Sequence, residues 1–273
     1  MRVKLIKDGI PILQCRACSL AWWVPGDDFD AKATYNASYF GGASTGHGYD
    51  DYGLLESSLR RTFRRRLSSL PQSEHEGTLL DIGAAYSFGM QAAREMGWRA
   101  VGIEISKAAA QAARTAGEQK IAVARAEAIP FEDNRFQVVT LWDVLEHVPD
   151  PDAVMKNVAR VITPGGRLML TTGNVESWLA RLSRSKWHLY TLPEHLFFFS
   201  RKSLEILLDR HGFKVEAMTT EASFYTLGYL SERIRKTIFG QNRGHPARWP
   251  GANLEIPVNL YDILRVTATR EPT

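Results

Sequence analysis

A carboxylate and a turn of small residues stand at a spacing that suits nucleoside binding. The segment LLDIGAAYSFG predicts a buried strand that bends sharply at Gly83 before a helix, and Asp81 lies just before that bend. A second apolar run ends about twenty residues later at Glu104. Its carboxylate would lie at the carboxyl end of the neighbouring strand, where it could accept hydrogen bonds from two ribose hydroxyls. These residues therefore predict a crevice for a nucleoside cofactor.

The composition of this turn bears on which nucleoside would bind. The stretch from Gly83 to Gly89 departs from the pattern G-x-G-x-x-G, whose second glycine leaves room for a pyrophosphate. Ala85 stands at that position. A cofactor without phosphates tolerates this methyl group better. An NAD-dependent oxidoreductase, which would share the crevice and the ribose carboxylate, is therefore the less favoured interpretation.

The order of the motifs along the chain is more specific. LLDIG, GIEIS, AEAIPFEDNRFQVVTLWDVLEHVPDP and ITPGGRLMLTTGN resemble motifs I to V of the class I S-adenosylmethionine (SAM)-dependent methyltransferases. PEHLFFFSRKSLEILLDRHGFKV resembles the acceptor-side segment of a bacterial small-molecule branch that includes ubiquinone-type O-methyltransferases. The resemblance implies SAM as cofactor and a small-molecule acceptor, a ring, a sugar or a lipid-linked compound, with oxygen as the expected target atom.

The resemblance also implies a role for each residue that matches these motifs. Ordinary structural roles remain open for three of them: Asp81 could anchor the turn, Glu104 could be a solvated strand end, and Asp143 could cap a short helical turn. The implied cofactor-binding residues are Asp81 and Gly83 at the methionine end, Ala84 and Ala85 in the turn, Glu104 on the ribose, Ile105 on the adenine, Ala126 and Glu127 at the adenine edge, and Asp143 near the sulfonium.

Two places depart from the family pattern. Ala85 and Ser87 replace the second and third glycines of the turn, and Arg125 replaces the acidic residue that usually precedes the adenine-contacting alanine. A non-catalytic SAM-binding or partner-binding protein therefore remains an alternative to a methyltransferase.

Two histidines are candidates for the proton transfer that an oxygen or nitrogen acceptor requires. Methyl transfer from a sulfonium is an in-line displacement, so positioning supplies most of the rate and a base near neutral pKa removes the acceptor proton. His147 follows a predicted strand in LEHV, and His195 lies in the acceptor-side segment PEHLFFFS. Each also has a structural alternative: a backbone hydrogen bond for His147 and packing against an aromatic cluster for His195.

Alternating strands and helices position these residues. Strands joined through helices need crossover connections, so the sheet should be largely parallel and covered on both faces. With the resemblance, this predicts an α/β fold with a Rossmann-like doubly wound sheet of seven strands, mostly parallel with one antiparallel strand. Expected strands are 78–83, 99–105, 120–126, 136–142, 167–172, 214–220 and 259–269; expected helices are 54–67, 88–97, 106–117, 151–162 and 200–212.

Two segments interrupt this alternation, residues 174–199 and 222–257, and both are candidate walls of the acceptor site. In the second, Phe224–Phe239 predicts a basic amphipathic helix that docks on the core or contacts a membrane or a lipid-linked acceptor. The aromatic residues Trp178, Trp187, Tyr190 and 197–199 would line an apolar pocket or pack in the core. For Arg60, Arg61, Arg64, Arg65 and Arg66, a solvated helix face is favoured over an anion-binding role.

The remainder of the chain bounds the other expectations. Residues 1–50 are predicted to be an irregular extension to a methyltransferase domain at 51–273, and Cys15 and Cys18 a vestigial C-x-x-C turn without metal, because two thiolates cannot complete a tetrahedral site. Basic and acidic residues number 34 and 30, a balance that gives no reason to expect nucleic-acid binding. Two cysteines and no signal peptide suit the cytoplasm, and the oligomeric state stays open.

Overall fold

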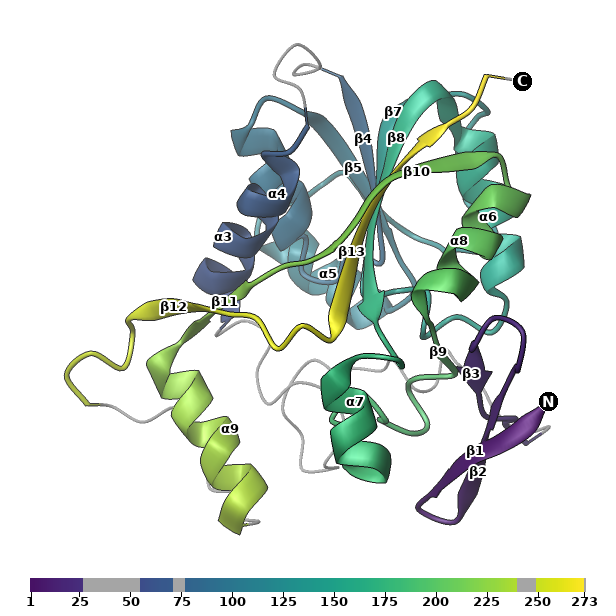
Figure 1. Cartoon of the computed structure of the whole chain (residues 1–273). Coiled ribbons are helices and arrows are strands. Elements are labelled where there is room, and N and C mark those ends of the chain that lie inside the picture. The colour runs from purple at the N-terminus through teal and green to yellow at the C-terminus, as the bar shows by residue number, and fades with distance from the viewer. Residues whose placement is uncertain (27–54, 71–76, 240–248, 273) are drawn as a thin grey trace.

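The computed structural model describes residues 1–26, 55–70, 77–239 and 249–272. Its central sheet consists of β4 (Thr78–Ile82), β5 (Arg99–Glu104), β6 (Ile121–Val123), β7 (Phe136–Trp142), β8 (Ile162–Gly173), β10 (Phe213–Thr220) and β13 (Ile263–Arg270). The seven strands lie in the order β10-β13-β8-β7-β4-β5-β6 (Figure 1). All pairs are parallel except those of β13, which is antiparallel to β8 and β10. The predicted fold and its single antiparallel strand are confirmed.

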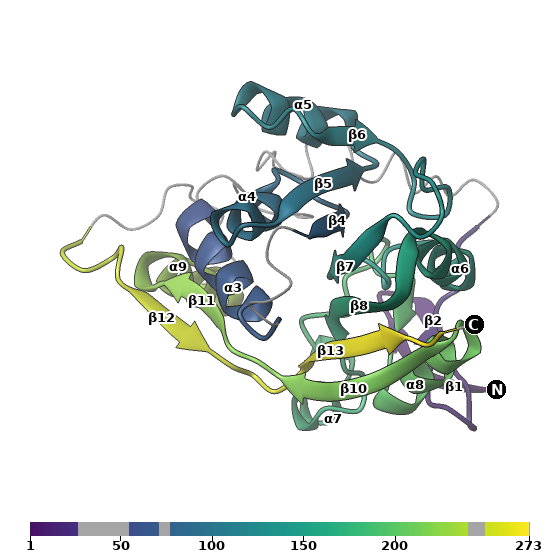
Figure 2. The ribbon, with the colours of Figure 1, turned by 90° about the horizontal axis from the view of Figure 1, so that it is seen from above.

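Helices cover both faces of this sheet. One face carries α3 (Glu56–Leu67), α4 (Phe88–Glu95) and α5 (Lys107–Thr115), and the other carries α6 (Pro151–Val161) and α8 (Arg201–Arg210) (Figure 2). Local sequence fixes where α6 and α8 begin. The Asp150 carboxylate accepts a hydrogen bond from the Ala153 amide at 3.0 Å and Pro151 opens α6, while Ser200 forms a capping box with Ser203 at the start of α8.

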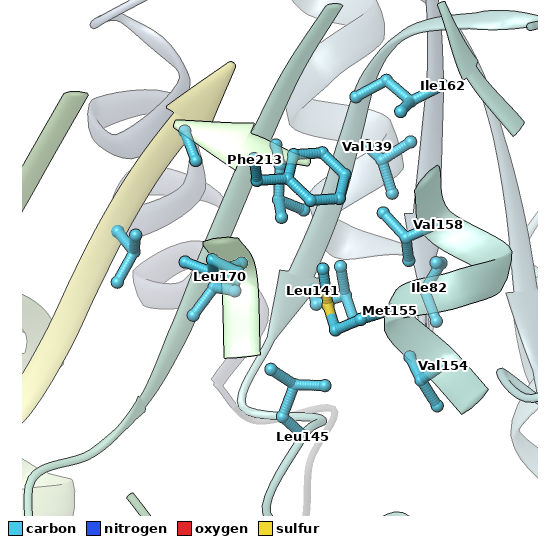
Figure 3. Packing of buried hydrophobic residues seen from close by; sticks show 14 of the residues in the cluster. Ile82, Val139, Leu141, Leu145, Val154, Met155, Val158, Ile162, Leu170 and Phe213 are labelled. Atoms are coloured by element: carbon cyan, nitrogen blue, oxygen red, sulfur yellow. The ribbon is translucent and has the colours of Figure 1, made fainter. Parts of the chain in front are cut away.

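The core between β7, β8 and α6 explains why these strands are almost continuously apolar. Val139, Leu141 and Leu170 lie on the sheet face that packs against Met155 and Val158 of α6 (Figure 3). All five side chains are fully buried. Strands covered on both faces must be apolar on both, so the runs FQVVTLW and RLMLTT carry no alternation.

The N-terminal residues depart from the prediction of an irregular extension, which was wrong for the described part. The strands β1 (Arg2–Lys7), β2 (Ile10–Gln14) and β3 (Ala21–Trp22) form an antiparallel sheet with β9 (Phe197–Phe198), in the order β1-β2-β3-β9. Asp8 and Gly9 connect β1 to β2 with φ values of 50° and 82°. Positive φ at both residues is the backbone of a tight hairpin turn, for which Asp-Gly is a favoured pair. Residues 27–50 of the expected extension, and its boundary at 50/51, lie outside the described residues.

The two interrupting segments contain short elements of their own. Residues 174–199 hold α7 (Trp178–Ser183), the 3₁₀-helix η3 (Arg184–Lys186) and β9. Residues 222–257 hold β11 (Ser223–Thr226), α9 (Leu227–Phe239) and part of β12 (Glu255–Val258). The predicted helix 224–239 begins only at Leu227, because residues 223–226 pair with β12.

These additions gather at one edge of the central sheet. The helices α7 and α9 and the β1-β2 hairpin all lie beyond the edge at which the parallel strands end (Figure 1). Ligands of doubly wound sheets bind outside the carboxyl ends of the strands, so this edge is where the site is expected. Within the described ranges, no helix is both long and apolar enough to cross a membrane.

Candidate functional site

A cavity of about 860 Å³ opens at this edge and brings most of the predicted site residues together. One end of the cavity is lined by the turn after β4 and by the ends of β5 and β6. The other end is lined by the turn after β7, by residues 188–195, and by β11 and α9. Of the predicted residues, the cavity is lined by Gly83, Ala85, Glu104, Ile105, Ala126, Glu127, Asp143, His147 and His195, whereas Asp81 and Ala84 lie behind it.

The turn after β4 has the backbone path of a glycine-rich turn although two of its glycines are replaced. Gly83, Ala85 and Ser87 all have positive φ, at 72°, 46° and 67°. The Gly83 and Ala84 amides donate to the Ile103 carbonyl at 2.9 and 3.0 Å, which folds the turn over β5. The substitutions at Ala85 and Ser87 therefore leave the left-handed path intact, at a steric cost that glycine would not carry.

Gly83 is the position of the turn that steric contact restricts most clearly. A Cβ atom there would lie 2.7 Å from Val144 Cγ2. We expect Gly83→Ala to lower the free energy of unfolding by about 1–2 kcal/mol, because of the positive φ, and to weaken SAM binding, because Val144 must move within the cavity wall. Gly117→Ala is the matched control: its φ is 96° and its Cβ would meet nothing within 4 Å. Urea unfolding measures the stability of both variants, and calorimetry measures their affinity for SAM. Normal SAM affinity in both variants would contradict this expectation.

Glu104 is held in place by the turn that it faces. Its Oε2 accepts a hydrogen bond from the Ala85 amide at 2.9 Å, and its Oε1 accepts one from the Ser106 amide at 2.7 Å. Burial raises the pKa of this carboxyl, and the hydrogen bonds from the amides of Ser106 and Ala85 act in the opposite direction. Each oxygen keeps acceptor capacity for a ribose hydroxyl, because a carboxylate oxygen has two lone pairs.

Asp81 lies beneath the turn. Its side chain is buried, and Oδ1 accepts a hydrogen bond of 2.6 Å from the Thr140 hydroxyl on the neighbouring strand β7. Burial and, to a smaller extent, the charge of Glu104 raise the pKa of Asp81 to about 7, against the opposing effect of the hydrogen bond from Thr140. The side-chain hydrogen bond joins β4 to β7, and the role of Asp81 toward the turn or the cofactor stays a prediction.

Asp143 has a strained backbone at the centre of the cavity wall. Its φ is 55°, and its amide donates to the carbonyl and the hydroxyl of Thr171, each at 3.1 Å. A non-glycine residue persists in this conformation only where its surroundings impose it, and such residues cluster at functional sites. At the far wall, Arg125 forms an ion pair of 3.2 Å with Glu127 beside Ala126.

The structure places the two candidate histidines against each other. The rings of His147 and His195 meet edge to face with centroids 4.5 Å apart. Backbone hydrogen bonds join their segments, because the Glu146 carbonyl accepts from the Leu196 and Phe197 amides at 2.7 and 3.1 Å. His147 Nδ1 lies 3.0 Å from the Glu194 carbonyl, which can only accept, so Nδ1 carries the proton and Nε2 holds the lone pair.

Burial keeps this cluster uncharged near neutral pH. It lowers the pKa of His147 to about 4, and it lowers the pKa of His195 well below the usual range, with the charge of His147 adding to the shift. Burial, together with the charge of Asp143, raises the pKa of Glu146 to about 8. The expectation of a base with a near-neutral pKa therefore needs correction: both imidazoles are available as bases, but they are weaker than a solvated histidine.

Glu146 should make stability depend on pH. Its pKa is about 8 in the folded chain against 4.5 unfolded, so the folded chain holds an extra proton between these values and stability falls as pH rises. The histidines penalise the fold only below about pH 6.5. In the wild-type protein the free energy of unfolding should fall between pH 6.5 and pH 8. We expect this fall to be smaller by about 2 kcal/mol in Glu146→Gln, and Asp81 should cause the part that remains. Urea unfolding at both pH values checks this; the exposed Glu205→Gln is the control, and an unchanged pH dependence in Glu146→Gln would contradict it.

Metal-ligating side chains are grouped in one place among the described residues. The ligand atoms of Glu146, His147 and His195 lie within 4.8 Å of one another, a spacing that could hold a cation once Glu146 is ionised. Sequence reasoning named both histidines but missed the group, because His195 lies far along the chain from Glu146 and His147. Cys15 and Cys18 are free thiols in the turn between β2 and β3, and no third ligand from the described residues joins them. The absence of a metal stays a prediction.

For Trp187 and Tyr190, the structure favours the second of the two predicted roles, packing in the core. Trp187 and Tyr190 do not line the cavity; they are buried with Trp23 and Ile12 in a core between the N-terminal sheet and residues 174–199, and Trp178 is 57% exposed. The aromatic wall of the cavity, within the described ranges, instead consists of Phe63, Trp142, Tyr225 and Tyr229.

Arg66 is also placed differently from the prediction of a solvated face. It is 5% exposed and lines the cavity. The signal in the sequence was its spacing, since Leu59, Thr62, Phe63 and Arg66 fall on one side of a helix and all line the cavity. The run of arginines concealed it, because four of the five do lie on the outer side of α3.

Comparisons with known proteins agree with this geometry. Residues 55–218, more than half of the chain, match a family model described as a methyltransferase domain. A ubiquinone biosynthesis O-methyltransferase of Alkalilimnicola ehrlichii is 29% identical over 167 residues, which cover 58% of this chain and 68% of that protein. Other curated relatives of that name are matched over about half of their length.

Solved structures show the same fold. A chain of a Haloferax volcanii complex between the Trm112 methyltransferase activator and a methyltransferase is similar with a TM-score of 0.59 and 16% identity. A SAM-dependent methyltransferase of Thermotoga maritima is similar with a TM-score of 0.54 and 20% identity. Both alignments cover 81% of this chain and 93% of the other. At these identities the likeness concerns the fold alone.

Proposed function

This chain belongs to the class I SAM-dependent methyltransferases, and from that membership we propose that it transfers the methyl group of SAM to an oxygen atom of a small-molecule acceptor. The observation that carries the proposal is the continuity of the cavity, in which Glu104 and Gly83 at one end share a volume of about 860 Å³ with His147 and His195 at the other. A cofactor and an acceptor can therefore meet within it.

The cofactor end fits a nucleoside with an amino-acid tail. In this proposal Glu104 accepts hydrogen bonds from the ribose, Ile105 packs on the adenine, and Gly83 and Asp143 border the methionine side. The positive φ values of Ala85 and Ser87 support it, because the turn keeps its path without the glycines. This also weakens the main reason for a non-catalytic SAM-binding protein.

The acceptor end can remove a proton without a charged group. When bound, SAM supplies a methyl group on a positively charged sulfur that becomes neutral as the carbon–sulfur bond breaks. The contact of Nδ1 with the Glu194 carbonyl leaves the lone pair of His147 at Nε2, and His195 packs against its ring. We propose that one of these imidazoles takes the proton of the acceptor hydroxyl as oxygen attacks the methyl carbon, and that enclosure of the site holds the reactants in line. The relatives named as O-methyltransferases favour oxygen over nitrogen or carbon.

Turnover with methyl-labelled SAM tests the proposal. Purified protein is incubated with labelled SAM and separated fractions of cell extract: polar metabolites, lipids, protein and nucleic acid. We expect label in the polar or lipid fraction with an equal amount of S-adenosylhomocysteine, and the carbon chemical shift of the labelled methyl should identify an ether or ester. SAM binding without turnover in any fraction would favour the non-catalytic alternative, and label in nucleic acid or protein would contradict a small-molecule acceptor.

A further inference from the structure

One buried cation in the cavity, Arg66, has no ion-pair partner among the residues that the structure describes. Arg66 is 5% exposed, its Nε has no hydrogen-bond partner, and its Nη2 makes only a long contact of 3.4 Å with Ser223 Oγ on β11. Among residues 1–26, 55–70, 77–239 and 249–272, no carboxylate forms an ion pair with it. A buried charge is costly unless it is paired, so the fold retains Arg66 at the expense of stability.

Aromatic rings orient this guanidinium along the cavity wall. Arg66 Cζ lies 5.1 Å from the centroid of Trp142 and 5.7 Å from that of Phe63. Stacking of this kind holds the plane of the guanidinium while its edge stays available for hydrogen bonds. The planar fork of arginine suits a carboxylate, which it can bind through two parallel hydrogen bonds.

A second cation and a phenol reach the same end of the cavity. Arg233 of α9 donates from Nη1 to the Tyr229 hydroxyl at 3.1 Å, and the Tyr229 ring stacks on Tyr225 with centroids 5.6 Å apart. Burial raises the pKa of Tyr225, and the charges of Tyr229 and Asp143 raise it further, whereas Arg233 and Arg66 lower it. The Tyr225 hydroxyl is thus within electrostatic reach of both guanidiniums and of Asp143.

Three of the carboxylates that line the cavity have other partners. Glu127 pairs with Arg125 at 3.2 Å, Glu232 pairs with Arg235 at 2.5 Å, and Glu104 accepts backbone amides. Asp143 lines the cavity as well, and none of these carboxylates forms an ion pair with Arg66 among the described residues.

We infer that Arg66, together with Arg233 and the Tyr225 hydroxyl, forms an anion subsite, and that the methyl acceptor is a small molecule bearing a carboxylate away from the oxygen to be methylated. The inference rests on the proposed function and specifies its substrate class. SAM also carries a carboxylate, on its methionine end. The acceptor is favoured because the contact of Arg66 with Ser223, and its charge effect on Tyr225, both point to β11 of the acceptor-side segment.

The test compares two probes of equal shape and different charge. Protein saturated with S-adenosylhomocysteine is titrated with 4-fluorobenzoate and with the neutral 4-fluorobenzamide, and binding is followed by fluorine NMR. We expect the benzoate to bind at least about tenfold more tightly, and Arg66→Met to abolish that preference. Arg64→Met is the matched control, since Arg64 lies on the same helix with its side chain 54% exposed and ion-paired to Glu95. It should keep the preference, as Arg66→Lys should in part.

Further measurements on Arg66→Met show whether Arg66 binds the acceptor or the cofactor. The ligand-free Arg66→Met variant should have a raised Tm, since it loses an unpaired buried charge; a lowered Tm would contradict that description. Its affinity for S-adenosylhomocysteine should change by less than about threefold. A loss of tenfold or more there, with normal affinity for 5′-methylthioadenosine, which has no carboxylate, would assign Arg66 to the cofactor and overturn the inference. Equal or absent binding of the two probes would overturn it as well, whereas failure of the wild-type protein to bind S-adenosylhomocysteine would refute the proposed function itself.

Discussion

Replacement of Glu104 by alanine is expected to weaken SAM binding by about 10²–10⁴-fold. The change removes the acceptor for two ribose hydroxyls, and each hydrogen bond to a charged group contributes roughly 1.5–3 kcal/mol, since both are made in a site shielded from water. The carboxylate also fixes the turn through the amides of Ala85 and Ser106, so its loss loosens the wall that faces the cofactor.

Calorimetry with SAM and with S-adenosylhomocysteine measures this effect directly. Glu205→Ala, an exposed carboxylate on α8, is the control for general changes in charge. A melting curve of ligand-free Glu104→Ala separates lost affinity from lost folding. Unchanged SAM affinity in a folded Glu104→Ala variant would remove the basis for placing the ribose at the end of β5.

Replacement of His195 by alanine is expected to lower kcat by about 10²–10⁴-fold while SAM affinity stays close to normal. His195 lines the acceptor end of the cavity, far along the wall from Glu104, and its ring packs on His147. Because burial depresses the pKa values of both histidines, the wild-type enzyme should keep its active, unprotonated base well below pH 6.5. The pH at which kcat falls on the acid side of its pH profile should therefore be lower than in an enzyme with a solvated histidine as base.

Steady-state kinetics with the identified acceptor, SAM titration and melting curves distinguish the two roles of His195. His211→Ala is the control, because His211 pairs with Asp152 on the α6 and α8 face, away from the cavity. A joint loss of stability and SAM binding in His195→Ala would indicate a packing role. Near-normal kcat in a well-folded variant would refute catalysis by His195 and leave His147 or positioning alone.

The local sequence was sufficient for the central sheet and the cofactor end. Most strands there are short apolar runs bounded by turn residues, and α5, α6 and α8 each have a capping residue, such as Asp150 before α6. The turn at Gly83 and the carboxylate at Glu104 are close to each other because β4 and β5 are adjacent parallel strands, which the alternation of strands and helices already requires.

Local signals also existed that the prediction did not use. The pair Asp8-Gly9 between two alternating apolar runs is a hairpin signal, and it would have replaced the irregular extension by β1 and β2. The position of Arg66 on the same helical side as Phe63 likewise indicated a buried guanidinium. In both cases the order of the residues indicated the observed structure, whereas the composition of the segment did not.

The acceptor end was decided by tertiary structure, because its residues meet only through contacts between distant segments. The Trp23 indole donates to the His195 carbonyl across 172 residues, and β3 pairs with β9 to hold that segment in place. His147 faces His195 only because the Glu146 carbonyl accepts hydrogen bonds from the backbone of residues 196 and 197. The sequence by itself determined the sheet, the motif order and the residues of the cofactor turn, since each depends on neighbours in the chain. Which aromatics line the cavity, how far burial shifts the histidine pKa values and where Arg66 points depend on which surfaces are covered, and only the assembled fold determines that.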